Sequence, residues 1–252
     1  MPPISATIIT HNEAANIARA IRSLDCADEI LVVDSGSTDE TVKIAADLGA
    51  RIIIHEWEGF AAQKNFAVRE AKHDWILSLD ADEELDEAAR AAIREWKQSA
   101  PVTAAYRFAR RARYMGRWIL HSGWYPDWKI RLFDRNQARW QGDYVHESVV
   151  TKVQVATMDG EILHYTCDSL ADHRKRIEFY TDLAAREMFE RGEQSGLGQR
   201  LLAPAWVFVH TYFFRFGVLD GMAGFLIAWM AARYVHRKYV KLAELQQSRG
   251  TP

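Results

Sequence analysis

The sequence predicts an α/β fold in which a mostly parallel sheet is flanked by helices, with a helical appendage at the C-terminal end. Three observations support this prediction. Short apolar runs alternate with helical stretches over the first 80 residues. Polar clusters follow three of these runs, and the composition becomes strongly apolar near residue 200. We therefore expect one large domain over residues 1–198 and a separate helical segment over residues 199–252.

The individual elements follow from the apolar pattern in order. Strands are expected over residues 4–10, 29–33, 51–55 and 75–79. Helices are expected over residues 13–24, between Ser37 and Gly49, and over residues 61–71. Asn12 is the expected N-cap of the first helix. Ser37 and Glu40 have the spacing of a capping box that opens the second helix, and Gly49 is expected to close it.

The three polar clusters fall at the carboxyl ends of predicted strands. They begin at Thr10, Asp34 and Asp80. The carboxyl ends of parallel strands meet at one edge of a sheet, and open α/β sheets bind ligands at that edge. Turns and helix caps account for part of this polarity, but they do not explain carboxylates that directly follow apolar strands. We therefore expect a ligand site there.

Asp80 and Asp82 form the chemically most specific of these clusters. Two carboxylates separated by one residue suit a hard divalent cation, because Mg²⁺ and Mn²⁺ prefer oxygen ligands and often share a site with a substrate phosphate. We expect Mg²⁺ or Mn²⁺ here, with Asp82 as the direct ligand. His164 follows another apolar run and is a candidate further ligand of the metal or of a diphosphate.

Composition excludes several classes of protein. The net charge is −2, which gives no basic field for nucleic-acid binding. Two cysteines, Cys26 and Cys167, are too few for a disulfide framework, so we expect a reduced, cytoplasmic setting. The first residues lack the basic start and apolar region of a signal peptide.

The C-terminal segment predicts contact with a membrane surface. Two apolar runs, residues 201–214 and 221–232, are each too short to cross a bilayer, which needs roughly 20 residues. Basic and aromatic residues follow them up to Lys241. This pattern favours two short helices that form a hairpin on a membrane surface, with residues 201–241 in contact. A buried helix pair or a dimer interface is the alternative.

The combined motifs resemble one known family. Thr10-His11-Asn12-Glu13, Asp34-Ser35-Gly36-Ser37-Thr38-Asp39, Gln63-Lys64-Asn65 and Asp80-Ala81-Asp82-Glu83 resemble the family 2 glycosyltransferases with the GT-A fold, over residues 4 to about 150. The runs Trp128–Phe133, Val145-His146-Glu147 and Phe216–Gly221 are similar to the lipopolysaccharide-core branch. Enzymes of that branch add β-linked glucose, or a related sugar, to the inner core of a lipid-linked acceptor.

The resemblance implies a role for each matching residue. It implies a UDP-sugar donor, although spacing alone does not exclude an ADP-sugar. The residues implied for the nucleotide sugar are Thr10, Asn12, Glu13, Asp34, Lys64, Asn65 and Asp80. Asp34 matches the carboxylate that accepts a hydrogen bond from the uracil ring, and Lys64 suits a diphosphate as a point charge. Asp80 matches the carboxylate near the ribose, and Asp82 matches the metal ligand.

An inverting transferase also needs a base that takes the proton of the attacking hydroxyl. Glu147 is our choice, with Asp143 as the runner-up. The family commonly has an acidic pair at this place, and this chain has His146-Glu147 instead; His146 would orient Glu147 or be structural. Arg131 is the residue that we expect to bind an anionic acceptor group.

Three other functions are possible for a protein with this predicted fold. A sugar-phosphate nucleotidyltransferase would need a glycine-rich loop after the first strand, and the cluster at Thr10 has no glycine. A transferase that acts on polyprenyl phosphate or another envelope glycan would keep Asp80, Asp82 and the membrane contact. The intact Asp34, Asp80 and Asp82 argue against a non-enzymatic sugar-nucleotide-binding protein, and unchanged turnover after substitution of Glu147 would favour it or move the base to another residue. The sequence therefore predicts an inverting, metal-dependent enzyme that moves a hexose to the inner core of lipopolysaccharide, with glucose as the expected hexose. We expect it to work at the cytoplasmic face of the inner membrane.

Overall fold

The computed structural model describes residues 1–142, 147–167 and 169–249, and the chain divides into two compact units. The first unit contains residues 1–111 and 127–165. The second contains residues 112–126 and the residues from 166 onward. The second unit thus begins earlier than residue 199, where we placed the boundary, and it includes a loop from the middle of the chain.

The first unit holds most of the sheet and four helices of the described chain. Its strands are β1 (Ile4–Thr10), β2 (Glu29–Asp34), β3 (Arg51–Ile54), β4 (Trp75–Asp80), β5 (Glu83–Leu85), β8 (Asp127–Asp134), β9 (Ala138–Gln141), β10 (Ser148–Thr151) and most of β6 (Ala105–Tyr114) and β11 (Val155–Cys167). Its helices are α1 (Ile17–Arg22), α2 (Thr41–Asp47), α3 (Phe60–Glu70) and α4 (Glu87–Gln98).

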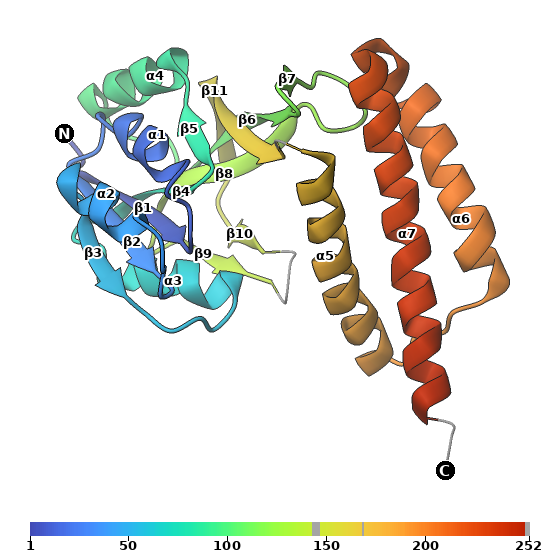
Figure 1. Ribbon diagram of the computed structural model, residues 1–252. Coiled ribbons are helices and arrows are strands. Elements are labelled where there is room, and N and C mark those ends of the chain that lie inside the picture. Colours follow the sequence, from blue (N-terminus) through green and yellow to red (C-terminus); the bar gives the residue numbers. More distant parts are fainter. Residues whose placement is uncertain (143–146, 168, 250–252) are drawn as a thin grey trace. The chain divides into compact units, whose positions relative to one another are not determined.

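The sheet confirms the predicted α/β class (Figure 1). Its strand order is β3-β2-β1-β4-β8-β6-β11-β5, with the short β7 (Arg117–Trp118) paired to β6, and β9 and β10 form a separate two-stranded sheet. The predicted strands β1 to β4 are parallel to one another, whereas β8 joins β4 antiparallel. The second half of the chain therefore extends a parallel sheet with antiparallel strands.

Helices cover both faces of this sheet. The apolar side chains of α1, α2 and α4 pack with one face of β1 and β4, around Ile8, Leu77 and Ile93. The residues of α3 pack against the other face, where Ala67 meets Leu31 and Val33 of β2. Alternate strand residues point to opposite faces, so each strand feeds both cores. The two cores fix the strand ends that carry the polar clusters.

Two predicted helix caps are wrong. α1 begins at Ile17 rather than at residue 13, and Asn12 has a positive φ of 55° and does not cap it. The hydroxyl of Ser37 donates to the Asp34 carboxylate instead of opening α2, which begins at Thr41. Asn12 is bonded to the neighbouring loop and Ser37 to Asp34 of its own loop, so neither side chain caps a helix. Gly49, with φ 84°, does follow the end of α2 as predicted.

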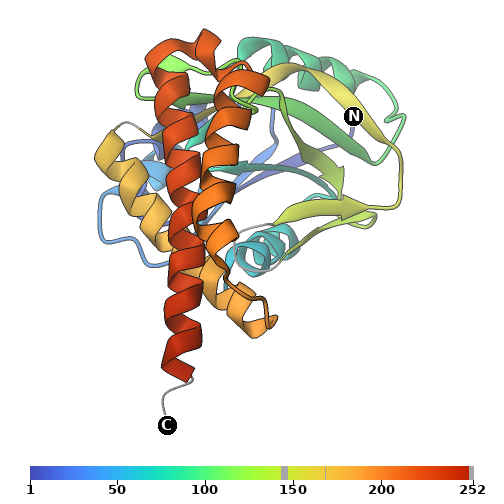
Figure 2. The ribbon, with the colours of Figure 1, turned by 90° about the vertical axis from the view of Figure 1, so that its right-hand side faces the viewer.

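The second unit is helical. It contains α5 (Leu170–Glu190), α6 (Leu197–Val209), a π-helical turn over His210–Phe214, a 3₁₀ turn over Gly217–Asp220, and α7 (Gly221–Arg249). Figure 2 shows α6 and α7 side by side as a hairpin. The Nδ1 of His236 lies 2.8 Å from the Arg200 carbonyl oxygen, and the Ser195 hydroxyl donates to the Tyr239 carbonyl at 2.6 Å. These contacts join the ends of the hairpin away from its turn.

The second helix of the hairpin is longer than predicted. We expected two short helices, but α7 continues through the basic residues to Arg249. Residues 225–249 contain neither Gly nor Pro, so nothing breaks the helix at Ala232. By length and composition, Gly217–Ser248 is the single helix within the described residues that could cross a membrane, and 28% of its most apolar window is buried.

Candidate active site

The three polar clusters meet at one edge of the sheet, as the sequence predicts. Thr10 of β1 pairs in register with Asp34 of β2, and Ile9 pairs with Asp80 of β4. Because these strands are parallel, their carboxyl ends lie side by side. The Thr10 hydroxyl is buried and has no hydrogen-bond partner within the described chain. A buried hydroxyl without a partner is costly, which marks this edge as a place where a polar ligand would be stabilised.

Asp34 organises the first loop of this edge. Its side chain is fully buried, and Oδ1 accepts hydrogen bonds from the amides of Gly36 and Ser37 at 2.9 and 2.7 Å. Oδ2 accepts from the Ser37 hydroxyl. Asn12 ties the loop after β1 to this loop. Its backbone amide donates to Ser37 Oγ, and its side-chain Oδ1 accepts from the Thr38 amide, both at 2.8 Å. Most of the acceptor capacity of Asp34 is therefore used within the protein.

Glu13 also holds this pair of loops together. Its amide donates to the Thr41 hydroxyl at 2.8 Å, and its carboxylate accepts from the Asn16 side chain at 2.7 Å. Thr41 is the first residue of α2, so the contact ties the loop after β1 to the helix after β2. Asn12, Glu13 and Asp34 are thus brought together, and each has a structural partner.

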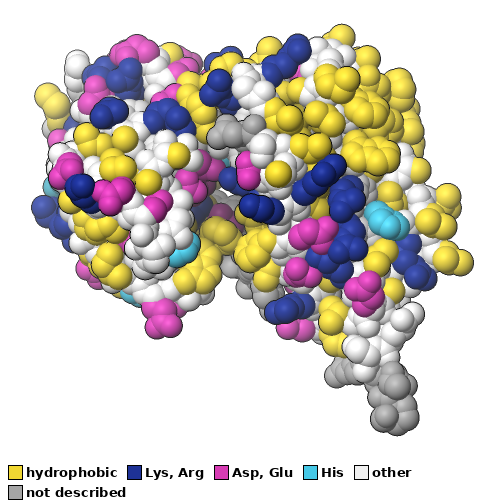
Figure 3. Space-filling model, in the orientation of Figure 1, with side chains coloured by type: hydrophobic (Ala, Val, Ile, Leu, Met, Phe, Trp, Pro, Cys, Tyr) yellow, Lys and Arg dark blue, Asp and Glu magenta, His cyan; other side chains and the backbone are white. Residues whose placement is uncertain are grey.

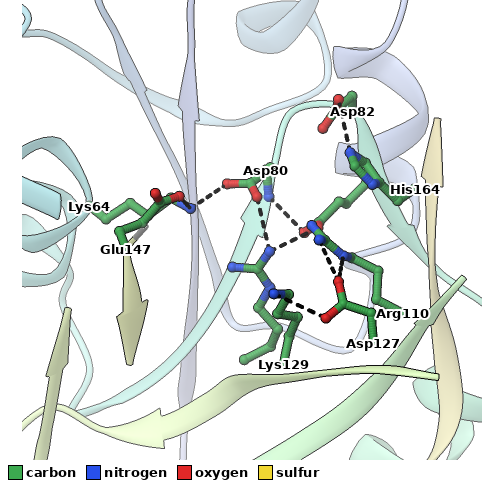
Figure 4. Close-up of polar contacts among 10 residues, drawn as sticks. Lys64, Asp80, Asp82, Arg110, Asp127, Lys129, Glu147 and His164 are labelled. Atoms are coloured by element: carbon green, nitrogen blue, oxygen red, sulfur yellow. Dashed lines mark hydrogen bonds and ion pairs between the residues drawn. The ribbon is translucent and has the colours of Figure 1, made fainter. Parts of the chain in front are cut away.

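A chain of ion pairs crosses this edge from Glu147, which directly precedes β10, to Lys129 of β8 (Figure 4). We call it the ion-pair chain; carboxylates and cations alternate along it in the order Glu147, Lys64, Asp80, Arg131, Glu83, Arg110, Asp127 and Lys129. Each step is an N···O distance between 2.6 and 3.1 Å. Asp127, Lys129 and Arg131 alternate along β8 and therefore share one face of the sheet.

Asp80 lies in the middle of this chain. Its Oδ1 is 2.7 Å from Lys64 Nζ, and its Oδ2 is 2.9 Å from Arg131 Nη2. Burial by itself raises the pKa of the Asp80 carboxyl, but the charges of Lys64 and Arg131 outweigh burial and hold that pKa well below its usual range. Asp80 is therefore ionised throughout the neutral range and is neutralised by two protein cations.

Glu83 is a site residue to which the sequence interpretation gave no role. Its side chain is fully buried, and Oε1 lies 2.8 Å from Arg131 and 2.9 Å from Arg110. Oε2 accepts the Asp80 backbone amide at 3.1 Å. The carboxylate thus fixes the turn that carries Asp82, and it neutralises two arginines at once. The sequence did carry a signal for this role, because Arg110 and Arg131 lie in stretches that also contain apolar residues and a buried arginine requires an acidic partner.

Lys64 and Asn65 are neighbours on α3 with different partners. Lys64 is 2% exposed; its Nζ lies between Asp80 and Glu147 and 4.3 Å from the centroid of the Trp140 ring. Asn65 forms two hydrogen bonds with the backbone of Trp140, as donor at 2.9 Å and as acceptor at 3.1 Å. Asn65 therefore clamps β9, and Lys64 links the two candidate acidic groups.

Asp82 and His164 form a separate pair beside this chain. His164 Nε2 lies 3.3 Å from Asp82 Oδ2, and both side chains are partly exposed. His164 belongs to β11 and pairs in register with Glu83, and the Tyr165 amide donates to the Asp82 carbonyl at 2.9 Å. Asp80 points to Lys64 and Arg131 instead of joining this pair. Within the described residues, no three His, Cys, Asp or Glu side chains converge as a metal cluster.

Two of the candidate residues, Asp143 and His146, lie outside the described residues. Glu147 is described, and Lys64 Nζ contacts its Oε1 at 3.0 Å. Arg131 is 3% exposed and pairs with Asp80 and Glu83. It therefore lies within the site but is already engaged by two carboxylates.

Comparison with known proteins identifies the family. Residues 5–153 match the family described as Glycosyl transferase family 2. The chain belongs to this family. It is 31% identical to an uncharacterised glycosyltransferase of Rickettsia felis, over 98% of this chain and 91% of that protein. It is 30% identical to the lipopolysaccharide core biosynthesis glycosyltransferase LpsC of Rhizobium meliloti, over 99% of this chain and 95% of that protein.

Among solved structures, this family 2 glycosyltransferase is similar to glucosyl-3-phosphoglycerate synthase from Mycobacterium tuberculosis. That protein was crystallised in complex with Mn²⁺, uridine diphosphate and glucosyl-3-phosphoglycerate. The identity is 22%, the TM-score is 0.37, and the match covers 44% of each chain.

The donor set of the glycosyltransferase fits a divalent cation at Asp82 and His164. A carboxylate oxygen and an imidazole nitrogen at 3.3 Å can share one ion, and phosphate oxygens and water would complete its coordination. When bound, such an ion would act as a Lewis acid on a leaving phosphate. Glu147 has the chemistry of a base and is the acidic group held next to Asp80 through Lys64.

Proposed function

We propose that this family 2 glycosyltransferase moves a hexose from a UDP-sugar to the inner core of lipopolysaccharide, with inversion at the anomeric carbon. Glucose is the hexose that we propose. The enzyme would work at the cytoplasmic face of the inner membrane, with residues 201–241 on the membrane surface. The named relative LpsC, similar over nearly its whole length, supports the acceptor class. Asp82 and His164 would hold a Mg²⁺ or Mn²⁺ ion, which would supply Lewis-acid chemistry for the departure of the diphosphate.

One observation carries the catalytic part of this proposal. Glu147 is joined through Lys64 to Asp80, the last residue of β4, which directly precedes Ala81 and the candidate metal ligand Asp82. An inverting transfer needs a base on one side of the sugar and the leaving group on the other. Glu147 would take the proton of the acceptor hydroxyl as that oxygen attacks the anomeric carbon and the bond to the diphosphate breaks.

The nucleotide would lie over the loops that follow β1 and β2. Asp34 keeps acceptor capacity for one imide N–H, since an ionised carboxylate has about four lone-pair sites and three are used here. The buried Thr10 hydroxyl at the same edge lacks a partner that a ligand would supply. Asp80, held by two cations, would face the ribose at the junction between the nucleoside and the metal.

A binding and turnover experiment tests this function. Thermal stability is measured with UDP, ADP, GDP and CDP, each with and without Mn²⁺, and turnover is measured with UDP-glucose and lipopolysaccharide core acceptor. A nucleotide at 100 times its Kd stabilises the fold by about 2.7 kcal/mol. We expect UDP to stabilise the protein, Mn²⁺ to increase this effect, and product to appear on the core acceptor.

Asp82→Asn should abolish turnover and the Mn²⁺-dependent part of the stabilisation. Asp74→Asn is the matched control: Asp74 directly precedes β4 at its opposite end, its side chain is 61% exposed, and its partner is Arg135. The control should behave as the parent protein. Normal Mn²⁺-dependent activity in Asp82→Asn would refute the metal assignment, and transfer to polyprenyl phosphate but not to core acceptor would replace the acceptor.

A further inference from the structure

An apolar surface covers the turn end of the helical hairpin in the second unit. Figure 3 shows hydrophobic side chains gathered over the upper parts of α6 and α7. Each of the following is more than half exposed: Trp206, Phe213, Phe214, Leu219, Met222 and Trp229. Soluble monomers rarely expose contiguous apolar patches of this kind, and such patches mark membrane or protein contacts.

The charges of the hairpin favour a membrane over a protein as the partner of this apolar surface. Residues 194–243 contain six Lys and Arg residues and a single acidic residue, Asp220. Asp220 is 3% exposed, so the exposed charged side chains of this segment are all basic. Three of the basic residues pair with Glu178 of α5, and they lie beyond the apolar part of α7. An apolar end followed by a basic belt complements anionic lipid.

A loop from the middle of the chain is locked to the turn of the hairpin. The Asp220 carboxylate accepts from the amides of Leu120 and His121 at 3.3 and 3.2 Å and from the Ser122 hydroxyl at 2.9 Å. The Ser122 amide in turn donates to the Arg215 carbonyl at 2.8 Å. We call this set of contacts the Asp220 clasp. Leu120 itself remains 47% exposed, so the loop adds to the apolar surface.

The clasp suits a hydrocarbon environment. In lipid, polar backbone and side-chain groups must be satisfied within the protein, because each unsatisfied group costs several kcal/mol. The single carboxylate of the hairpin turn is buried and accepts hydrogen bonds from the loop. The turn is also tightly packed, since a Cβ on Gly224 would lie 1.8 Å from the Gly217 carbonyl oxygen. The Asp220 carboxylate and the loop groups that donate to it are thus satisfied within the protein, and the exposed cations at this end are Arg215 of the turn and Arg117 of the loop.

The length of the apolar part matches one leaflet. Twelve residues of α7, from Gly221 to Ala232, precede the first basic residue, Arg233. At 1.5 Å per residue they extend ~18 Å. The hydrocarbon core of a bilayer is ~30 Å thick, so one leaflet is ~15 Å. A helix that spanned the bilayer from Gly217 would instead draw Arg233 and Arg237 towards the hydrocarbon.

We propose that the hairpin turn and the loop over residues 112–126 enter a single leaflet of an anionic bilayer together, and that both ends of the hairpin stay on the same side. This inference rests on the membrane contact in the proposed function and adds its depth, its topology and a second inserted segment. The surface contact expected from the sequence over residues 201–241 thus becomes a re-entrant insertion that includes Leu120.

Fluorescent labels at single introduced cysteines test the topology in the full chain. The sites are Leu219→Cys in the turn, Leu120→Cys in the loop, and Gln194→Cys and Ser248→Cys at the two ends of the hairpin. Cys26 and Cys167 are buried, and the parent chain measures their background labelling. The NBD-labelled proteins are added to preformed vesicles of phosphatidylcholine and phosphatidylglycerol. Dithionite, which does not cross the bilayer, is then supplied either outside or trapped inside.

We expect the labels at residues 219 and 120 to shift to the blue and to survive dithionite on both sides. The labels at 194 and 248 should be lost to external dithionite. Loss of the label at 219 to trapped dithionite would mean that the helix spans the bilayer and would overturn the proposal. Loss of the labels at 219 and 120 to external dithionite would mean surface binding only and would also overturn it.

Sedimentation with the vesicles separates this inference from the function on which it rests. A protein that stays in the supernatant refutes the membrane contact itself, whereas a bound protein with another labelling pattern refutes only the single-leaflet topology. Asp220→Ala tests the clasp: the label at 120 should become accessible to external dithionite while the label at 219 stays protected. Asp182→Ala, at a half-exposed Asp of α5, is the matched control and should leave both labels protected.

Discussion

The ammonium of Lys64 lies 3.0 Å from the carboxylate of Glu147, although the two residues are 83 positions apart. Lys64 is buried, and its second partner is Asp80 at 2.7 Å. One side chain of α3 therefore joins the candidate base to the end of β4. This link makes the catalytic assignment testable from both sides, by removing either the base or the cation that holds it.

Glu147→Gln should remove the base and leave the shape of the site intact. Because an amide cannot take the proton of the acceptor hydroxyl, we expect turnover to fall by roughly 10²–10⁴-fold while UDP binding changes little. Initial rates and nucleotide titration measure the two effects. Glu95→Gln, on the exposed side of α4, is the control. Normal turnover in Glu147→Gln would move the base to another residue.

Lys64→Met should destabilise the protein because it leaves the Asp80 and Glu147 carboxylates without their shared cation. Removing one partner of a buried ion pair typically costs about 3–5 kcal/mol. The pKa of Asp80 should rise as well, since the charge of Lys64 is a main cause of its depression. Denaturant unfolding measures the stability, and Lys64→Arg should recover most of it. An unchanged unfolding midpoint in Lys64→Met would show that the pair is dispensable.

Glu83→Gln should loosen the turn between β4 and β5. The neutral amide can no longer balance Arg131 and Arg110, so we expect a loss of about 3 kcal/mol in unfolding free energy together with lower turnover. Glu87→Gln is a matched control, because Glu87 begins α4 and its side chain is 69% exposed. Equal stability of the two variants would contradict the role that we assign to Glu83.

Asn65→Leu distinguishes a structural role from a nucleotide contact. The change removes both hydrogen bonds to the Trp140 backbone and leaves those backbone groups unsatisfied, at about 1–3 kcal/mol each. We expect lower stability with little change in nucleotide affinity. The opposite result, weaker UDP binding in an equally stable protein, would support the role implied by the family resemblance.

His173 should make the second unit sensitive to mild acid. Burial, aided by the charge of Arg176, lowers the pKa of His173 from 6.5 to about 4, and its Nδ1 lies 2.8 Å from the Tyr114 hydroxyl. Below pH 6.5 the unfolded chain therefore binds a proton that the folded chain rejects, so stability falls as the pH drops from 6.5 towards 4.

His173→Gln should flatten this part of the stability profile, measured by unfolding at a series of pH values. Glu178, whose pKa is lowered to about 2 by its hydrogen bond with Arg237, loses its contribution only between about 4.5 and 2. The pH ranges in which His173 and Glu178 lose their contributions are separate enough that each loss of stability can be assigned to one of the two residues. A variant that loses stability between pH 6.5 and 4 as steeply as the parent would exclude His173 as the cause.

Local sequence patterns predicted the strands well because burial on both faces leaves a strong apolar signal. β1 has the predicted bounds, and β2 and β4 each extend one residue further, to Asp34 and Asp80. The shared edge of these strands also followed from the pattern. The absence of caps at Asn12 and Ser37 could not be predicted in this way, because Asn12 bonds to residues 25 and 26 positions away and the Ser37 hydroxyl donates to the Asp34 carboxylate instead.

The partners of the site residues were equally hidden from local patterns. The sequence interpretation assigned Lys64, Asn65 and Arg131 to ligands, whereas each has protein partners in the structure. These partners come from β4, β5 and β9, which belong to two different sheets and are brought together only in the folded chain. The roles of the candidate residues towards donor, acceptor and metal stay predictions, and the variants above decide them.

The alternation of the ion-pair chain has a consequence for how the donor is recognised. Four carboxylates and four cations balance one another, so this line of groups is electrically neutral before any substrate arrives. A nucleotide diphosphate brings negative charge that the line has no surplus to compensate. Electroneutrality would then be restored by a cation that arrives with the nucleotide, and donor affinity would follow the concentration of that cation more closely than the bulk salt concentration.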